Sequence, residues 1–192
     1  FDMHLVSEVL TYRKNKGEEA YAAIINRLDR PVSGLVLIAK NKKEAARLSA
    51  LMQRESLCKQ YLVLVCGRPH SDTGTFTDYL LKNGKDNTSK VVSKEQAGAK
   101  KAVLEYSLID YDEERNVSRL LINLITGRHH QIRVQLSSRN MPVVGDGKYG
   151  GNPAVKKAEE YHIKMGCIAL CAKSLTVDGK VYEIEPEFSG GK

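Results

Sequence analysis

The sequence lacks any uninterrupted apolar run approaching the roughly 18 to 20 residues that a membrane span requires. Its first four residues, 1–4, also lack the basic region and the long apolar region of a signal peptide. From these absences we expect a cytoplasmic protein that does not insert into a membrane.

Cysteine is scarce, and none of the four cysteines belongs to a Cys-x-x-Cys pair. Two of them, Cys66 and Cys171, lie in apolar runs typical of strands, where a thiol behaves as a small hydrophobic group. Cys167 and Cys171 have no second pair with which to complete a zinc site. We therefore expect no structural metal and no disulfide.

No Gly-x-Gly-x-x-Gly motif, βαβαβ alternation, internal repeat, low-complexity tract or interdomain linker is evident. A chain of 192 residues is long enough to bury one continuous core. We therefore expect a single domain over residues 1–192, and we take a monomer as the default state.

Basic residues exceed acidic ones by 30 to 23, which gives a net charge of +7 and a pI near 9.2. Such an excess favours a polyanionic partner, nucleic acid above all, although many soluble proteins are mildly basic.

Hydrophobic periodicity predicts more strands than helices. We expect four helices. The first follows Asp2 and ends before Gly17, and the second follows the capping box of Asn41 and Glu44. The third follows Thr126-Gly127, and the fourth spans Pro153–Ile163. Predicted strands are a buried central strand over Gly34–Ala39, the run Gln60–Cys66, an antiparallel pair around Ala102–Leu108 and Leu120–Leu124, and a hairpin of Ile168–Val177 and Val181–Ile184 about Asp178-Gly179. Residues Ser71–Gly98 read as hairpins and exposed loops.

Asp29 lies between Arg27 and Arg30, just before the apolar run Gly34–Ala39. A solvated surface cluster and a functional carboxylate explain this pattern equally well when it is taken alone. Arginines and histidines also gather at the start of the helix after Thr126-Gly127, where they oppose the helix dipole. This second feature predicts anions at that helix end.

Three separated motifs occur in a fixed order: Arg27-Leu28-Asp29-Arg30, Lys59-Gln60-Tyr61 and Thr126-Gly127-Arg128-His129-His130-Gln131-Ile132-Arg133-Val134. The segments Met141–Gly150 and Ile168–Ala172 follow them. Together these segments resemble the RluA family of RNA pseudouridine synthases. The resemblance implies an α+β pseudouridine synthase fold, with a mixed, largely antiparallel sheet, helices on its outer faces and a catalytic cleft across it.

The resemblance further implies isomerisation of specific uridines in structured RNA, either ribosomal or transfer RNA. This reaction needs no cofactor and no metal. Asp29 corresponds to the catalytic aspartate, which attacks the ribose or removes a proton from it; the residues leave both routes open. Arg133 corresponds to the arginine that pairs with this aspartate, and Tyr61 to the tyrosine that stacks on the uracil.

By the same resemblance, Arg27 fills the space left by the everted uridine, and Leu170 forms a wall of the uracil pocket. Arg128, with His129, His130, Arg139 and Lys148, is expected to form a rim that contacts phosphates.

The chain departs from the family pattern beside these positions: Asn26, Gln135 and Cys171 each replace a histidine, and His129 replaces a threonine or serine. The family's upstream strand, often preceded by an S4 domain, is expected to be absent from this chain. Two alternatives remain: a non-catalytic RNA-binding or RNA-chaperone module, and a hydrolase that uses Asp29 on another glycosidic bond but lacks an evident second carboxylate.

Overall fold

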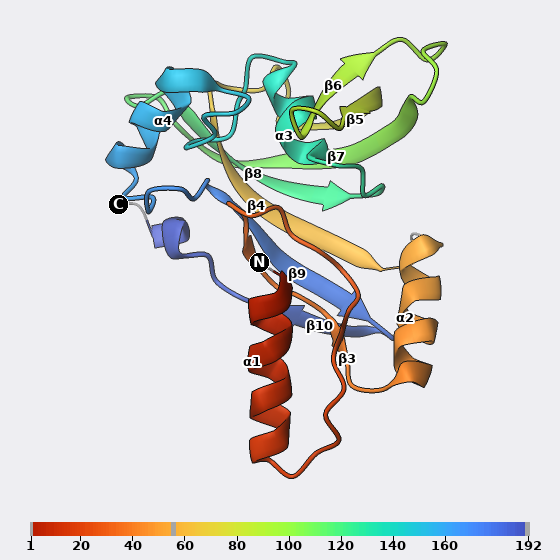
Figure 1. The fold of residues 1–192 in the computed structure, drawn as a ribbon. Helices are drawn as coiled ribbons and strands as arrows, with labels where there is room; N and C mark the ends of the chain where they lie inside the picture. The colour runs from red at the N-terminus through yellow and green to blue at the C-terminus, as the bar shows by residue number, and fades with distance from the viewer. Residues whose placement is uncertain (1, 55–56, 191–192) are drawn as a thin grey trace.

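The computed structural model describes residues 2–54 and 57–190 (Figure 1). Its core is an eight-stranded sheet in which every strand pairing is antiparallel except that of β2 with β9. The prediction of an α+β fold with a mixed, largely antiparallel sheet is therefore confirmed. The strands are β2 (Ser33–Gly34), β4 (Cys58–Cys66), β5 (Thr73–Asn83), β6 (Thr88–Val92), β7 (Lys100–Asp112), β8 (Val117–Leu124), β9 (Leu170–Val177) and β10 (Lys180–Glu183).

The strands follow the order β10-β9-β4-β8-β7-β5-β6, with β2 beside β9. The helices are α1 (Asp2–Asn15), α2 (Lys42–Gln53), α3 (Gln131–Ser137), α4 (Gly151–Glu160) and the 3-10 turn η1 (Glu187–Gly190). Within residues 2–54 and 57–190, no helix combines the length and the apolar character needed to cross a membrane.

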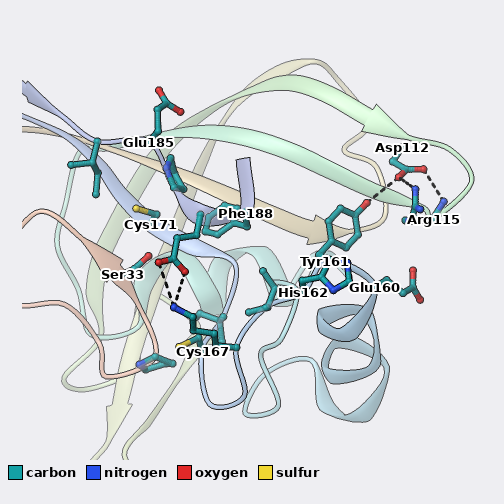
Figure 2. A pocket seen from close by; sticks show the side chains of 17 residues that line it. Ser33, Asp112, Arg115, Glu160, Tyr161, His162, Cys167, Cys171, Glu185 and Phe188 are labelled. Carbon is teal, nitrogen blue, oxygen red and sulfur yellow. Dashed lines mark hydrogen bonds and ion pairs between the residues drawn. The ribbon is translucent and has the colours of Figure 1, made fainter. Parts of the chain in front are cut away.

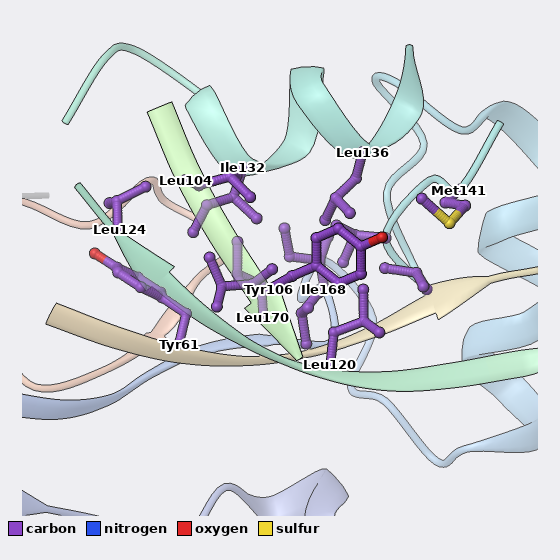
Figure 3. Close-up of a cluster of buried hydrophobic side chains, with 14 of the residues drawn as sticks. Tyr61, Leu104, Tyr106, Leu120, Leu124, Ile132, Leu136, Met141, Ile168 and Leu170 are labelled. Carbon is purple, nitrogen blue, oxygen red and sulfur yellow. The ribbon is translucent and has the colours of Figure 1, made fainter. Parts of the chain in front are cut away.

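The central strand β4 contributes to a separate core on each face of the sheet, because successive side chains of a strand point to opposite faces. Tyr61, Val63 and Val65 belong to the cluster that Ile132 and Leu136 of α3 cover from above (Figure 3). The intervening residues of β4 join a second cluster with parts of α4 and η1. Helices therefore cover both faces of the sheet, and α3 covers the face to which Tyr61 points.

Helix α2 begins as the capping box predicts. The side-chain oxygen of Asn41 accepts a hydrogen bond from the backbone N–H of Glu44 at 2.9 Å. The apolar face of α2, which includes Leu48, packs with Leu175 and Val177 of β9. This packing fixes the end of the sheet opposite α4 (Figure 1).

The predicted central strand over Gly34–Ala39 is wrong. Only Ser33–Gly34 pairs with β9, whereas Ile38–Ala39 forms β3, which pairs with β1 (Ala23–Ile24) in a separate two-stranded sheet. Gly34 explains the break, because its φ is +127° and a Cβ there would lie 2.5 Å from the backbone nitrogen of Ala172. An apolar run alone does not distinguish a strand from such a crossing segment.

The prediction of hairpins and exposed loops over Ser71–Gly98 is confirmed in part. Strands β5 and β6 form a hairpin, but β5 is an eleven-residue strand that also pairs with β7 in the main sheet. One helix boundary needs correction. Helix α4 begins at Gly151 and ends at Glu160, earlier at both ends than the predicted Pro153–Ile163. The β7–β8 pair and the β9–β10 hairpin are confirmed.

Candidate active site

Asp29 lies in the loop between β1 and β2, and this loop is fastened at both ends. The side chain of Asn26 donates to the carbonyl of Leu35 and accepts from the N–H of Leu37. At the other end, the carbonyl of Pro31 accepts the N–H of Ile168 at 3.1 Å. The Asp29 side chain is thereby held with 28% of its surface exposed.

Arg133 extends from α3 toward this loop. Its Nη1 lies 3.3 Å from Oδ2 of Asp29, so the contact expected from the resemblance is present. The arginine side chain is only 5% exposed, whereas the carboxylate faces solvent in part. The cation is therefore the buried member of the pair, and Asp29 is the member that a ligand can reach.

Asp146, which the sequence reasoning did not single out, binds the same guanidinium. Its two oxygens accept from Nε and Nη2 of Arg133 at 2.7 and 2.9 Å. Burial lowers the pKa of Arg133, but the hydrogen bonds to Asp146 and the charge of Asp29 outweigh it and raise the pKa. The anions predicted near the start of α3 are thus two carboxylates of the chain itself.

A sequence signal for Asp146 existed in the segment Gly145-Asp146-Gly147. This turn lets one Asp146 oxygen also accept the backbone N–H groups of Lys148 and Tyr149. Because a buried charge needs several partners, an acidic residue within an apolar, glycine-rich turn indicates a buried ion pair.

Tyr61 lies near the start of β4, where a bulge at Gln60/Tyr61 shifts the register against β9. The residue is 8% exposed, and Leu170 lies in the same cluster. Figure 3 shows the Tyr61 hydroxyl at the edge of this cluster, pointing away from its centre. Burial, with a smaller contribution from the charge of Asp29, raises the pKa of Tyr61 to about 12. The phenol is therefore neutral at ordinary pH and lies within range of the charge of Asp29.

Gln131 shapes the loop that precedes α3. Its side-chain oxygen accepts from the Thr126 hydroxyl at 2.8 Å and from the Arg128 N–H at 2.9 Å. Its amide nitrogen donates to the carbonyl of Val103 on β7. His130, which directly precedes Gln131, adopts the left-handed region at φ +53°.

The expected phosphate-contacting rim is only partly on the surface. Of its members, Lys148 is exposed, and Arg128 and His129 are partly buried. Arg27, expected at the gap left by the everted uridine, is exposed. The expectation for His130 is wrong: it is 8% exposed, and its Nε2 lies 3.7 Å from Oδ2 of Asp29.

The Arg139 side chain is 30% exposed but is engaged within the protein. Its guanidinium binds the carboxylate of Asp78, with Nη1 2.9 Å from Oδ2, and covers the ring of Phe76. The sequence does not show whether Arg139 contacts RNA or pairs within the protein, because Asp78 is 61 residues away in a region predicted as hairpins and exposed loops.

A pocket of about 620 Å³ lies behind the Asp29 loop, lined by Pro31 and Ser33 among others (Figure 2). Its charged residues include the ion pair of Lys164 with Glu187. Neither Asp29, Tyr61 nor Arg133 lines it. This pocket is therefore separate from the carboxylate site.

In the described part of the chain, no three His, Cys, Asp or Glu side chains gather in a way that could hold a metal ion. The arrangement around Asp29 offers a different chemistry. A carboxylate beside a buried guanidinium and an aromatic ring can serve as a nucleophile or a base toward a bound sugar.

Comparisons with known proteins point to one family. Residues 3–138 match the family model described as RNA pseudouridylate synthase. Over 182 residues the chain is 29% identical to the ribosomal large subunit pseudouridine synthase C of Rickettsia prowazekii, covering 94% of this chain and 57% of that protein. It is 37% identical over 134 residues to the ribosomal large subunit pseudouridine synthase D of Blochmanniella floridana, covering 70% and 40%.

Solved structures share the fold. Human RNA Pseudouridylate Synthase Domain Containing 1 superposes with a TM-score of 0.75 at 23% identity, over 95% of this chain and 74% of that one. Human RNA Pseudouridylate Synthase Domain Containing 4 gives 0.77 at 19% identity, over 95% and 80%. The chain spans about half the length of the curated relatives it matches.

Proposed function

The chain belongs to the RNA pseudouridylate synthase family, and we propose that it isomerises uridines in structured RNA to pseudouridine, with Asp29 as the catalytic residue. In this reaction the bond from the ribose C1′ to the uracil N1 breaks, the base turns, and C1′ bonds to C5. The C5 hydrogen leaves as a proton, and N1 gains one. Nothing is oxidised or reduced, so the reaction requires no redox cofactor.

In this proposal each site residue has one task. Asp29 attacks the ribose or removes a proton from it, and Arg133 balances its charge. The Tyr61 ring stacks on the uracil, while Leu170 forms an apolar wall. Arg27 occupies the gap that the everted nucleotide leaves in the RNA, and Arg128 contacts the phosphate backbone of the RNA.

The observation that carries the proposal is the 3.3 Å contact between Asp29 and Arg133. The charge of this carboxylate also acts on the buried phenol of Tyr61. The same geometry speaks against a glycoside hydrolase. Such enzymes typically use two carboxyl groups that flank the bond. Asp146, the second carboxylate near Arg133, is bound through both oxygens to that arginine and is fully buried.

We propose ribosomal RNA as the leading substrate class, because the relatives named above are large-subunit ribosomal enzymes. Transfer RNA is the second candidate. The net charge of +7 favours either RNA. The proposal retains a cytoplasmic monomer that needs no bound metal.

The test is release of tritium from total RNA labelled at C5 of uridine. We expect the wild-type chain to release tritium and Asp29→Asn to lower the rate by at least about a thousandfold, as removal of an essential catalytic group does. RNA binding, measured by filter retention, should change by less than about threefold, since phosphate contacts dominate affinity.

The matched control is Asp178→Asn. It removes an exposed carboxylate in the turn between β9 and β10, where Asp178 pairs with Arg47 of α2. Its rate should equal that of the wild type. RNA binding by the wild-type chain without any tritium release would instead identify a non-catalytic RNA-binding module.

A further inference from the structure

A chain of polar contacts leads away from Asp29 through His130. The Nε2 of this histidine lies 3.7 Å from Oδ2 of the carboxylate, and its Nδ1 lies 2.7 Å from the hydroxyl of Tyr149. The same hydroxyl oxygen accepts the backbone N–H of Ser89 in β6 at 2.9 Å. His130 therefore bridges Asp29 and a tyrosine that β6 holds in place.

These contacts favour one of the two neutral tautomers of His130. A tyrosine hydroxyl has one hydrogen to donate. Because the Ser89 N–H already donates to the Tyr149 oxygen, the Tyr149 hydrogen satisfies His130 when Nδ1 is an acceptor. The proton of a neutral ring then lies on Nε2, the nitrogen that faces Asp29.

The surroundings of His130 keep the ring uncharged. Burial lowers the pKa of His130 to about 4, and the cations of Arg133 and Lys148 act in the same direction, while Asp29 opposes them. His129 also disfavours the imidazolium, since the two rings are stacked with centroids 3.8 Å apart. At neutral pH His130 is thus a neutral N–H donor.

Arg133 and His130 both approach the same oxygen of the Asp29 carboxylate. Arg133 Nη1 lies 3.3 Å from Oδ2, and His130 Nε2 lies 3.7 Å from the same atom. Oδ1 carries neither contact. The two donors therefore distinguish the carboxylate oxygens from each other.

We propose that His130 is a positioning residue that holds Oδ2 of Asp29 through Nε2–H, so that Oδ1 is the oxygen presented to the ribose, with Tyr149 fixing the required tautomer. This inference rests on the proposed function. The 3.7 Å separation is longer than a hydrogen bond. Contacts of this kind often tighten only when substrate fills the site.

The hairpin of β5 and β6 also holds His129, the residue next to His130. The Ser89 hydroxyl lies 2.8 Å from Nδ1 of His129, and Asn87 lies 3.0 Å from its Nε2. His129 is consequently fixed at both nitrogens, and its stacked ring limits the tilt of His130. His129, one of the departures from the family pattern, thereby contributes to the site without touching Asp29.

Two substitutions at His130 separate positioning from packing. In His130→Gln the amide nitrogen reaches the position of Nε2, whereas in His130→Asn it reaches only that of Nδ1. Asparagine tolerates the φ of +53° at this position, so this variant should fold. We expect His130→Asn to lower kcat about 100-fold, the scale of a misplaced catalytic group, and His130→Gln to stay within about tenfold of wild type.

A spectroscopic readout tests the tautomer independently of turnover. In protein labelled with ¹⁵N-histidine, the His130 signals, assigned by their loss in His130→Gln, should show an unprotonated Nδ1 and a protonated Nε2. Tyr149→Phe keeps the ring that lies 5.0 Å from the Arg133 guanidinium but removes the donor to Nδ1. We expect this variant to gain the Nδ1–H form of His130 and its kcat to fall about tenfold. This loss is smaller than that of His130→Asn, in which the N–H donor no longer reaches Asp29.

Equal kcat values for the Asn and Gln variants, or an Nδ1–H signal in the wild type, would overturn the inference. Absence of tritium release by the wild type would instead reject the proposed function. In that case the ¹⁵N signals still decide whether His130 presents an N–H to Asp29, because they require no turnover.

Discussion

Arg133 is bound more closely by Asp146 than by Asp29. Two hydrogen bonds of 2.7 and 2.9 Å join Arg133 to Asp146, whereas its contact with Asp29 is 3.3 Å long. A planar guanidinium held by two parallel bonds cannot rotate freely. Asp146 therefore sets the direction in which Nη1 points, and Asp29 receives an arginine that is already oriented.

Removing Asp146 should destabilise the fold as well as the site. Asp146→Asn leaves a buried guanidinium without its main anion, so we expect the free energy of unfolding to fall by about 3 to 5 kcal/mol. Urea unfolding followed by circular dichroism measures this change. Asp178→Asn, which breaks an exposed pair with Arg47, should leave the free energy of unfolding nearly unchanged. Equal losses in the two variants would contradict the central role of Asp146.

Tyr61 should matter through its ring and not through its hydroxyl. Tyr61→Phe keeps the stacking surface, and we expect its kcat/KM for RNA to stay within about threefold of wild type. Tyr61→Leu removes the stacking surface and should weaken uridine binding by about 1 to 3 kcal/mol, seen as a raised KM. Steady-state tritium release measures both variants. A Phe variant as impaired as the Leu variant would show that the hydroxyl takes part.

Gly34 should tolerate no side chain. In Gly34→Ala the new Cβ meets the backbone of Ala172 at 2.5 Å, in a conformation with φ of +127°. We expect the free energy of unfolding to fall by at least about 2 kcal/mol, because neither backbone can move without breaking the pairing of β2 with β9. Gly84→Ala is the control, since nothing lies within 4 Å of its Cβ position. Its stability, measured in the same urea titration, should change by less than about 1 kcal/mol.

The buried histidines should make stability depend on pH. Burial lowers the pKa of His130 to about 4 and lowers that of His129 as well, whereas an unfolded histidine titrates near 6.5. Between these values the unfolded chain binds more protons than the folded chain, so acid favours unfolding. The histidine contribution is fully present above about pH 6.5 and is lost as the pH falls toward 4.

The measurement is urea unfolding at a series of pH values from 7.5 to 4.5. The His130→Asn variant lacks one of the two groups, so its stability should decline less steeply than that of the wild type over this interval. Parallel slopes for the two proteins would show that His130 does not titrate at this lowered pKa.

Much of the fold followed from local patterns. The alternation along β7 and β8 predicted their pairing, and the cap at Asn41 predicted the start of α2. The crossing segment after Asp29 could not be predicted in the same way. Its residues are as apolar as those of a central strand, and only the close approach of Gly34 to Ala172 divides them between two sheets.

The sequence by itself determined the residue types that the site uses and their order along the chain, because the motifs around Asp29, Tyr61 and Arg133 are local. The tertiary structure alone decided their mutual geometry, since Asp29 and Arg133 are 104 residues apart. It also buried His130 and Asp146, which short-range patterns do not distinguish from surface charges. Burial and charge pairing depend on which distant segments meet, and packing of α3 against the sheet brings these segments together.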